Sequence, residues 1–598
     1  MPIITSNKTQ PEYDVIVVGS GAGGGTSAYV LAMEGVKVLM LEAGRNYDPL
    51  TETPMFQTPD QAPLRGVPTP DKQQGFFDAT VDGGWDVPGE PYTSADGVDF
   101  QWWRARMLGG RTNHWGRISL RMGPYDFKPY SRDGLGIDWP IDYEDLEPWY
   151  DKTEAMVGIC GSNEGLENTP NSSPGILQPA PAPRAYELLA KDRCKALGIP
   201  VIPCHRAVMS TKQDGARIAN LCHPGNPRAQ ELLAQHLNSR AACFWATPCR
   251  RGCSIKANYQ STTVHIPPAL ASGNLDIVCD AMVREVTLNE SGQATGVHYV
   301  DKQTRTDQHA KARVVVLCAS GCESARILLN SKSSMFPDGL ANSSGLVGKY
   351  LMDTVGADLR GQIPALENLP RANEEGNTGL HMYMPWWHYQ EQMAGKLDFA
   401  RGYHIEFGGG QRMPGAGTFG RIPQMIGGAY GKKLKEEARR YYGSFMGFSG
   451  RGEMIPNVNS YCDIDPDRVD DYGIPVLRFH WKWSEHELNQ AAHMHRTFKE
   501  IIEVMGGTVT SEFHGDDGSK AIRKPGQVIH EVGTTCMGSD PQKSVLNQYC
   551  QSWDVRNLFV TDGGCFASNA DKNPTLSLMA IAWRSCDHLA RELRKGNI

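Results

Sequence analysis

Short apolar runs at the start of the chain flank a segment of helical pattern. Residues 13–18 form a mostly β-branched run that ends at Gly19, which is typical of a buried parallel strand. Residues 26–34 have the pattern of a helix, and residues 36–41 form a second apolar run that ends at Glu42. Together they predict a strand–helix–strand unit of about thirty residues.

Similar patterns return later in the chain. Those at 314–317 and 555–562 predict strands, and those at 323–329 and 574–594 predict helices. Residues 351–520 instead show spaced aromatic residues and glycines, which indicate an antiparallel sheet with long connections. The succession predicts an α/β fold, α+β overall, in which a Rossmann-like domain is joined to an antiparallel-sheet domain.

With 598 residues, the chain is long enough for two or more domains. Residues 50–100 are rich in Pro, Gly and Asp, which predicts long loops of the kind that serve as lids or interface arms. The expected dinucleotide-binding domain is discontinuous and comprises 11–50, 101–130, 205–350 and 520–598. The expected substrate-binding domain, with its lid and loop segments, comprises 51–100, 131–204 and 351–519.

Composition and charge exclude several classes of protein. Hydrophobic residues make up 40% and charged residues 21% of the chain, which is ordinary for a globular protein. The net charge of -7 argues against a nucleic-acid partner, which usually needs a basic surface. Apolar runs long enough for a transmembrane segment do not occur. Residues 1–11 contain neither an apolar stretch nor a twin arginine, so we expect no export signal in the chain itself.

The turn between the first strand and the first helix carries a glycine fingerprint, Gly-x-Gly-x-x-Gly, at residues 19–24. In such a motif Gly19 allows the tight turn, Gly21 lets the backbone approach a pyrophosphate, and Gly24 allows close helix packing. Glu42, at the end of the next strand, can accept hydrogen bonds from ribose hydroxyls. The motif alone leaves both FAD and NAD open.

A second set of motifs lies near the C-terminus. His530 opens the pattern H-x-x-G-T-x-x-M-G, and Asn573 lies in the later segment Lys-Asn-Pro-Thr-Leu. A further glycine-rich segment, 109–116, reads Gly-Gly-Arg-Thr-Asn-His-Trp-Gly. In this order, and with the strand–helix at 314–329, these motifs resemble the glucose–methanol–choline (GMC) family of flavin oxidoreductases over nearly the whole chain. The resemblance implies a GMC/PHBH-like fold and FAD in the dinucleotide site.

The His530–Asn573 combination is most similar to the sugar-oxidising branch of that family, which includes pyranose oxidases, FAD-dependent glucose and fructose dehydrogenases, and glucoside 3-dehydrogenases. Many other members carry a second histidine where this chain has Asn573. Many also have Asp-His where this chain has Asp353-Thr354, with a consequence that the sequence does not show. The resemblance implies oxidation of a sugar or glucoside hydroxyl, preferably at C3. The alternatives are oxidation at C1 or C2, an oxidase that uses O₂, and a non-catalytic flavin-binding subunit.

Alcohol oxidation by a flavin moves a hydride to the flavin and a proton to a base. Histidine suits the base because it titrates near neutral pH. Asn573 can donate from its amide to the same oxygen and fix its direction. We therefore expect His530 to be the base and Asn573 to orient the substrate. Two aromatic runs, 102–103 and 386–389, are candidates for stacking against a sugar ring.

Further flavin contacts follow from the resemblance. The position that matches His114 holds the flavin covalently in pyranose oxidases; the alternative is that His114 only packs near it. Asp562 can contact the ribityl and pyrophosphate part of the flavin cofactor; the alternative is that it only ends a strand. The implied cofactor-binding residues, besides the fingerprint, are Arg111, Asn113, His114, Val283, Asp562 and Gly563.

Three of the 15 cysteines, Cys243, Cys249 and Cys253, follow a C-x5-C-x3-C spacing. Thiolates on one loop suit an iron–sulfur cluster, here of three irons, and the spacing resembles the cluster loop of bacterial FAD-dependent glucose dehydrogenases. Cys222 is a possible extra ligand. The rivals are zinc, with the nearby His205 and His223, and buried free thiols.

The resemblance also implies partners. In the dehydrogenases concerned, a small subunit carries the export signal and a cytochrome accepts the electrons. Co-export to the periplasm with such a subunit is one expectation, and a cytoplasmic enzyme without a partner is the other.

Overall fold

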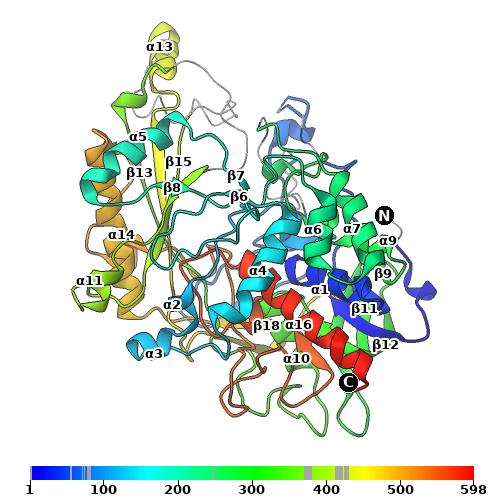
Figure 1. Ribbon diagram of the computed structural model, residues 1–598. Helices are drawn as coiled ribbons and strands as arrows, with labels where there is room; N and C mark the ends of the chain where they lie inside the picture. Colours follow the sequence, from blue (N-terminus) through cyan, green and yellow to red (C-terminus); the bar gives the residue numbers. More distant parts are fainter. Residues whose placement is uncertain are drawn as a thin grey trace.

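The computed structural model describes residues 3–598 except 54, 56, 59, 71, 73–74, 77–81, 246, 248, 370–379, 411–421, 423–427 and 429. Two large sheets organise this part of the chain, one mostly parallel and one antiparallel (Figure 1). The predicted fold class is confirmed.

The first sheet has seven strands. Strand β1 (Tyr13–Val18) lies at its centre, between β12 (Thr306–Leu317) and β2 (Val38–Leu41), and pairs parallel with both. The parallel part is completed by β9 (Leu275–Val278) beside β2 and β20 (Leu558–Val560) beside β12. Because the carboxyl ends of these strands meet at one edge, the turns that follow β1, β2 and β12 lie together there.

Strand β12 begins eight residues before the predicted run at 314, and the difference has a physical reason. Its first four residues are exposed or half-buried, and residues 309–313 alternate between exposed and buried. Residues 306–311 pair antiparallel with β11 (Ala294–Asp301), which in turn pairs with β10 (Ala281–Leu288). Only its last residues are buried on both faces. Helix α1 (Ala22–Met33) likewise begins before the predicted Thr26, since three glycines form its first turn.

The predicted C-terminal helix is confirmed as α16 (Thr575–Lys595), which packs against α1 and α4 (Tyr143–Val157). Helix α10 (Gly321–Asn330) follows β12. The remaining helices on this side of the molecule are α6 (Gly215–Cys222), α7 (Pro227–Asn238), α8 (Ser261–Val264) and α9 (Ile266–Ala271).

The predicted antiparallel sheet has six strands in the order β19-β13-β16-β15-β14-β8. Their bounds are β8 Ile202–Pro203, β13 Val355–Gln362, β14 Met382–Met384, β15 Tyr403–Gly408, β16 Phe445–Gly452 and β19 Thr508–Val509. Helix α14 (Glu485–Val504) packs on β13 and β16, and Figure 1 shows it on the side of the molecule opposite to α16. Parts of the predicted 351–520 segment lie outside the described residues.

Short elements complete the fold. A three-stranded sheet joins β4 (Thr93–Ser94), from the predicted loop region, to β18 (Pro475–His480) and β17 (Tyr461–Val469). Two two-stranded ladders are formed by β3 (Gly83–Gly84) with β5 (Arg104–Ala105) and by β6 (Cys160–Gly161) with β7 (Gln178–Pro179). Short helices are α2 (Pro124–Phe127), α3 (Pro129–Asp133), α5 (Ala185–Arg193), α11 (Tyr389–Met393), α13 (Gly431–Tyr441) and α15 (Gly518–Ala521). No helix within the described ranges is long and apolar enough to span a membrane.

Candidate active site

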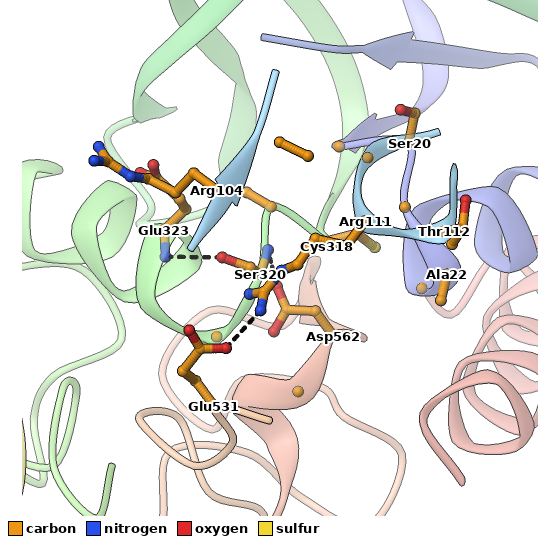
Figure 2. Close-up of a pocket in the computed structure, with 18 of the residues that line it drawn as sticks. Ser20, Ala22, Arg104, Arg111, Thr112, Cys318, Ser320, Glu323, Glu531 and Asp562 are labelled. Carbon is orange, nitrogen blue, oxygen red and sulfur yellow. Dashed lines mark hydrogen bonds and ion pairs between the residues drawn. The ribbon is translucent and has the colours of Figure 1, made fainter. Parts of the chain in front are cut away.

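A cavity of about 620 Å³ lies at the carboxyl edge of the parallel strands. It is lined by the glycine turn, by the 103–118 segment and by both C-terminal motifs (Figure 2). The sequence-predicted residues that line it are Gly19, Gly21, Glu42, Arg111, His114, Val283, His530, Asp562, Gly563 and Asn573. Gly24 and Asn113 lie behind the lining residues, and the three cysteines of the 243–253 loop lie elsewhere.

The glycine turn fits a pyrophosphate. Gly19 adopts φ +98°, a left-handed conformation that favours glycine. A Cβ at Gly24 would lie 2.0 Å from the Gly19 carbonyl oxygen, so the third glycine is required by the packing of helix on turn. A Cβ at Gly21 would meet nothing within 4 Å, because this residue faces open space at the start of α1. The free backbone N–H groups of the helix N-terminus can therefore reach an anion.

Glu42 holds this turn as well as facing the cavity. Its Oε2 accepts the backbone N–H of Ser20 at 3.1 Å, and its Oε1 accepts that of Gly44 at 2.7 Å. Burial raises the pKa of the Glu42 carboxyl, while the bonds from Ser20 and Gly44 oppose the shift. Val283 of β10 also lines the cavity, and β10 begins beside Glu42, whose carbonyl accepts the Ala281 N–H at 2.9 Å. This end of the cavity thus offers a carboxylate acceptor beside an apolar strand.

Asp562 organises the next part of the wall. It accepts the backbone N–H groups of Gly564 at 2.8 Å and of Ser320 at 3.1 Å, and the Ser324 hydroxyl. Burial raises its pKa to about 6 against these bonds. Asp562 therefore ties the end of β20 to the start of α10, and this tie places Gly563 on the cavity.

Arg111 is held by a residue that the sequence analysis did not single out. Its Nη1 donates to Glu531 Oε2 at 2.6 Å and to the Ile529 carbonyl at 3.3 Å (Figure 2). Glu531 directly follows His530, so the ion pair fixes the motif on the cavity wall. The sequence signal that could have identified Glu531 was its negative charge inside the His530 motif.

Asn113 and His114 are positioned differently. The Asn113 amide donates to the carbonyls of Leu108 and Gly110 at 3.0 and 3.1 Å and so braces the turn. His114 lies on the cavity, and its Nε2 accepts the indole N–H of Trp103 at 3.0 Å. Burial, with help from Arg117 and Arg111, lowers the pKa of His114 to about 3, so the ring is neutral. A neutral ring whose Nε2 accepts must carry its proton on Nδ1.

The two C-terminal motifs meet at the far end of the cavity. Asn573 Nδ2 lies 3.4 Å from His530 Nε2, and Thr354 Oγ1 lies 3.0 Å from His530 Nδ1. The hydroxyl of Thr354 thus supports the histidine where many GMC members have a histidine of their own. Asp353 accepts the backbone N–H groups of His530 at 2.9 Å and of Val528 at 3.1 Å.

The backbone before His530 is strained. Ile529 is β-branched yet has φ 68°, a conformation that such residues rarely adopt. Strain of this kind persists where the surroundings over-determine the backbone, and it concentrates at functional sites. Burial and then Arg451 lower the pKa of His530 to about 3, below the near-neutral value expected of the base. The imidazole is therefore neutral, with one ring nitrogen unprotonated, and is a weaker base than an exposed histidine.

Two charged residues of the antiparallel sheet complete this end. Asn573 Nδ2 donates to Glu406 Oε1 at 3.2 Å, and Arg451 Nη2 donates to Glu406 Oε2 at 3.2 Å. Glu406 lies on β15 and Arg451 on β16. Neither was predicted, because spaced polar residues in a strand do not by themselves indicate which face meets a distant loop.

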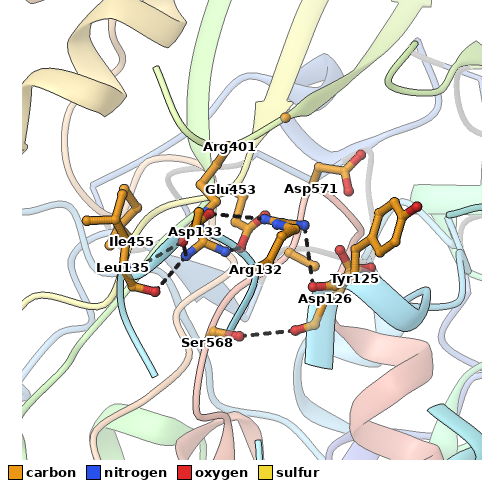
Figure 3. A network of polar contacts seen from close by, with 12 residues as sticks. Tyr125, Asp126, Arg132, Asp133, Leu135, Arg401, Glu453, Ile455, Ser568 and Asp571 are labelled. Atoms are coloured by element: carbon orange, nitrogen blue, oxygen red, sulfur yellow. Dashed lines mark hydrogen bonds and ion pairs between the residues drawn. The ribbon is translucent and has the colours of Figure 1, made fainter. Parts of the chain in front are cut away.

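The segment that carries Asn573 rests on buried charges (Figure 3). Lys572 Nζ lies 3.1 Å from Asp126 Oδ2 and 2.6 Å from Asp571 Oδ1. Beside them, Arg401 pairs with Glu453 at 2.9 Å and with Asp133 at 3.1 Å, as Figure 3 shows. Removing one partner from such a network leaves an uncompensated buried charge, so the loop is held firmly in place.

Only one of the predicted aromatic candidates lines the cavity. Trp103 lines the cavity together with Trp85 and Trp115, whereas Trp102 and the 386–389 run do not. Trp386 instead packs against Tyr403, with ring centroids 4.8 Å apart. Trp386 and His388 also contact His493 of α14, and Tyr389 packs against Tyr125. The run therefore belongs to the packing around the antiparallel sheet.

The three-cysteine loop does not gather around one point. Cys243, Cys249 and Cys253 form no disulfide bonds, and the latter two are buried. The Cys243 and Cys253 sulfurs each accept a nearby backbone N–H, from Trp245 at 3.3 Å and from Ala257 at 3.2 Å. No group of three or more His, Cys, Asp or Glu residues within the described part of the chain is arranged to hold a metal ion.

Comparisons with known proteins point to one family. Family models described as GMC oxidoreductase match residues 13–355 and 458–582. A 2-methyl-1,2-propanediol dehydrogenase of Mycolicibacterium austroafricanum is 29% identical over 97% of this chain and 95% of that protein. A fructose dehydrogenase large subunit of Gluconobacter japonicus is 26% identical over 98% of both. The solved structure of pyridoxine 4-oxidase from Mesorbium loti shares the fold, with a TM-score of 0.60 at 15% identity over 97% of this chain and 99% of that one.

Proposed function

Because the chain belongs to the GMC oxidoreductase family, we propose that it oxidises a secondary hydroxyl of a sugar or small polyol, with His530 as the base and Asn573 as the orienting group. The family implies FAD as the cofactor and an alcohol or sugar as the substrate. The observation that carries the proposal is the contact of His530 with Asn573 on the cavity that the glycine turn also lines.

The residues present fit FAD. The glycine turn and the N-terminus of α1 would hold the pyrophosphate, Glu42 the ribose, and the 562–563 segment the ribityl part. Bound FAD supplies the two-electron acceptor for the C–H bond of the substrate. The chain itself has to remove the hydroxyl proton and hold the reacting carbon in line.

His530 Nε2 is suited to that proton. The imidazole is neutral, its Nδ1 is supported by Thr354, and the 3.4 Å contact with Asn573 is long enough for a substrate hydroxyl to replace it. Asn573 would then donate its N–H to the substrate oxygen while His530 takes the proton. General-base catalysis of this kind contributes about 10²–10⁴-fold to the rate.

The experiment is anaerobic mixing of the FAD-loaded protein with a panel of sugars, glycosides and diols, followed by flavin absorbance. Loss of the oxidised flavin band with at least one of them supports the proposal. Retention of the band with every alcohol tested would indicate a non-catalytic flavin-binding subunit instead.

For the position of oxidation we propose C3, which rests on the resemblance to glucoside 3-dehydrogenases. NMR of the product decides the point. A 3-keto sugar supports C3 oxidation, whereas a lactone would show C1 chemistry.

We further propose that the enzyme is a dehydrogenase rather than an oxidase. Turnover in air should then be slow and should accelerate with an artificial electron acceptor. Full turnover in air with stoichiometric peroxide would identify an oxidase of the pyranose-oxidase type.

A three-iron cluster on Cys243, Cys249 and Cys253, a cytochrome acceptor, and periplasmic export with a small signal-bearing subunit form a separate proposal. It rests on the cysteine spacing and on the resemblance alone. The described conformation does not arrange the three thiols as ligands of one metal site. Iron and acid-labile sulfide in anaerobically purified protein would support it; FAD-replete protein without iron would refute it.

A further inference from the structure

We propose that Glu406 is a positioning residue that sets the tautomer of His530 through the amide of Asn573. The inference deepens the proposed function and rests on His530 being the base. It follows from a chain of hydrogen bonds that begins on β15 of the antiparallel sheet and ends at the imidazole.

The first link fixes the charge of Glu406. Burial favours the protonated carboxyl, but Arg451, His404 and Asn573 outweigh it and hold the pKa of Glu406 well below its usual range. Arg451 Nη2 donates to Oε2 at 3.2 Å, and Arg451 is held in turn by the Ser449 hydroxyl at 2.6 Å. Glu406 is therefore an ionised carboxylate, which can only accept hydrogen bonds.

The second link fixes the amide of Asn573. Because the group 3.2 Å away can only accept, the amide must present its NH₂ to Glu406 Oε1 and not its carbonyl oxygen. The same NH₂ carries a second hydrogen, and His530 Nε2 lies 3.4 Å from the nitrogen. Glu406 thereby ensures that a donor faces the histidine.

The third link fixes the tautomer. The Asn573 N–H can donate to Nε2 only if that nitrogen has a lone pair. The ring proton therefore resides on Nδ1, and this N–H donates to Thr354 Oγ1 at 3.0 Å. An amide turned the other way would present its oxygen to Nε2 and favour the opposite tautomer, which cannot accept a proton at Nε2. In the Ser-His-Asp triad, where a carboxylate holds the imidazole tautomer by direct contact, loss of that control lowers kcat about 10⁴-fold.

Several charged groups surround this chain. Arg451 and Glu406 act on His530 with opposite sign, and His404 and Arg111 add to the effect of Arg451. His404 itself lies 3.5 Å from Glu406 Oε1 through Nε2, and its Nδ1 contacts the Asp571 carbonyl. His404 therefore ties the carboxylate to the loop that carries Asn573.

The test compares Glu406→Gln with Glu406→Asp. A glutamine at 406 can offer either its oxygen or its NH₂ to Asn573, so it no longer selects one amide orientation. We expect the rate of anaerobic flavin reduction by substrate to fall at least about tenfold in E406Q, with KM within threefold of wild type and FAD content unchanged. E406D keeps the charge and should recover much of the lost rate. Glu367→Gln is the matched control. Glu367 forms an ion pair with Arg440, with an N–O distance of 2.7 Å, and this pair does not line the cavity.

Two readouts separate tautomer control from a structural role. The solvent deuterium isotope effect on flavin reduction should rise in E406Q, because removal of the hydroxyl proton becomes limiting. A crystal structure of E406Q should show the Asn573 amide moved away from His530 Nε2. Reduction at the wild-type rate in E406Q, with His530→Ala inactive, would overturn the inference and leave the proposed function intact. Wild-type rates in both variants would overturn the assignment of His530 as the base in the proposed function.

Discussion

His114 shows how one hydrogen bond decides a property of the whole cofactor site. A histidine forms a covalent bond to a flavin through a ring nitrogen with a free lone pair. Here Nε2 accepts the Trp103 indole N–H at 3.0 Å, and Nδ1 carries the proton of the neutral ring. The lone pair of Nε2 is engaged by the indole, and Nδ1, which has no hydrogen-bond partner, has no lone pair to attack with while it carries the proton.

We therefore expect the FAD to be non-covalent. Acid precipitation of the purified protein should release all flavin into the supernatant, and the denatured chain should show no flavin fluorescence on a gel. His114→Ala, which removes the only cavity-lining histidine of that segment, should leave the amount of released flavin per folded protein similar. Flavin that stays on the wild-type chain but not on H114A would contradict the geometry.

The sequence predicts some residues of the site and not others. His530, Asn573 and the fingerprint glycines stand in motifs whose spacing carries the chemistry, and the structure brings them to one cavity. Glu406 and Arg451 stand on neighbouring strands without a motif, and only the packing of the antiparallel sheet against the 571–573 loop makes them relevant. Such convergence depends on tertiary structure, so a single sequence gives no signal for it.

At the scale of elements, the glycine turn offers a matched pair of substitutions. In Gly24→Ala the new methyl would lie 2.0 Å from the Gly19 carbonyl oxygen, so helix and turn must separate. We expect a loss of about 1–3 kcal/mol of stability even without FAD, as is typical of overpacking. Thermal unfolding of the apoprotein measures it.

Gly21→Ala is the counterpart, because its methyl would meet nothing within 4 Å and would enter the cavity. The apoprotein should unfold at nearly the wild-type temperature while its affinity for FAD falls. Equal unfolding temperatures for G24A and wild type, or wild-type FAD affinity in G21A, would refute the assigned roles.

Elements themselves were predictable where pattern and environment coincide. Strand β1 has the predicted bounds because it is buried on both faces between two parallel neighbours. The last strand is shorter than predicted, at Leu558–Val560, since only these residues pair with β12. The edge strand β8 has only two residues and pairs with β14, which is distant in the sequence. No local pattern therefore predicts it.

At the scale of the whole molecule, buried neutral histidines should make the fold sensitive to acid. His114, His236, His265 and His530 each have a pKa lowered to about 3, chiefly by burial. Between that value and the ordinary 6.5 the unfolded chain binds more protons than the folded one, so stability falls as pH drops. Well above pH 6.5 the histidines are neutral in both states, and proton binding costs no stability. At pH 5 each histidine lowers the free energy of unfolding by at most about 2 kcal/mol.

Unfolding midpoints at pH 7 and pH 5 check this expectation, with a clear decrease at pH 5. His236→Gln, remote from the cavity, should show a smaller difference between the two pH values than wild type, whatever its absolute stability. Asp562, whose pKa is raised to about 6, shifts the midpoint in the opposite direction, so the comparison of the two proteins is decisive. A pH difference in His236→Gln equal to that of wild type would show that buried neutral His236 does not contribute to acid sensitivity.

The central claim is that His530 removes the hydroxyl proton on a cavity that also holds FAD. The most direct measurement is the rate of anaerobic flavin reduction by an active sugar or alcohol in His530→Ala, alongside its FAD content. We expect FAD to remain bound and the reduction rate to fall by at least about 100-fold. Reduction at close to the wild-type rate, with FAD bound, would contradict the account.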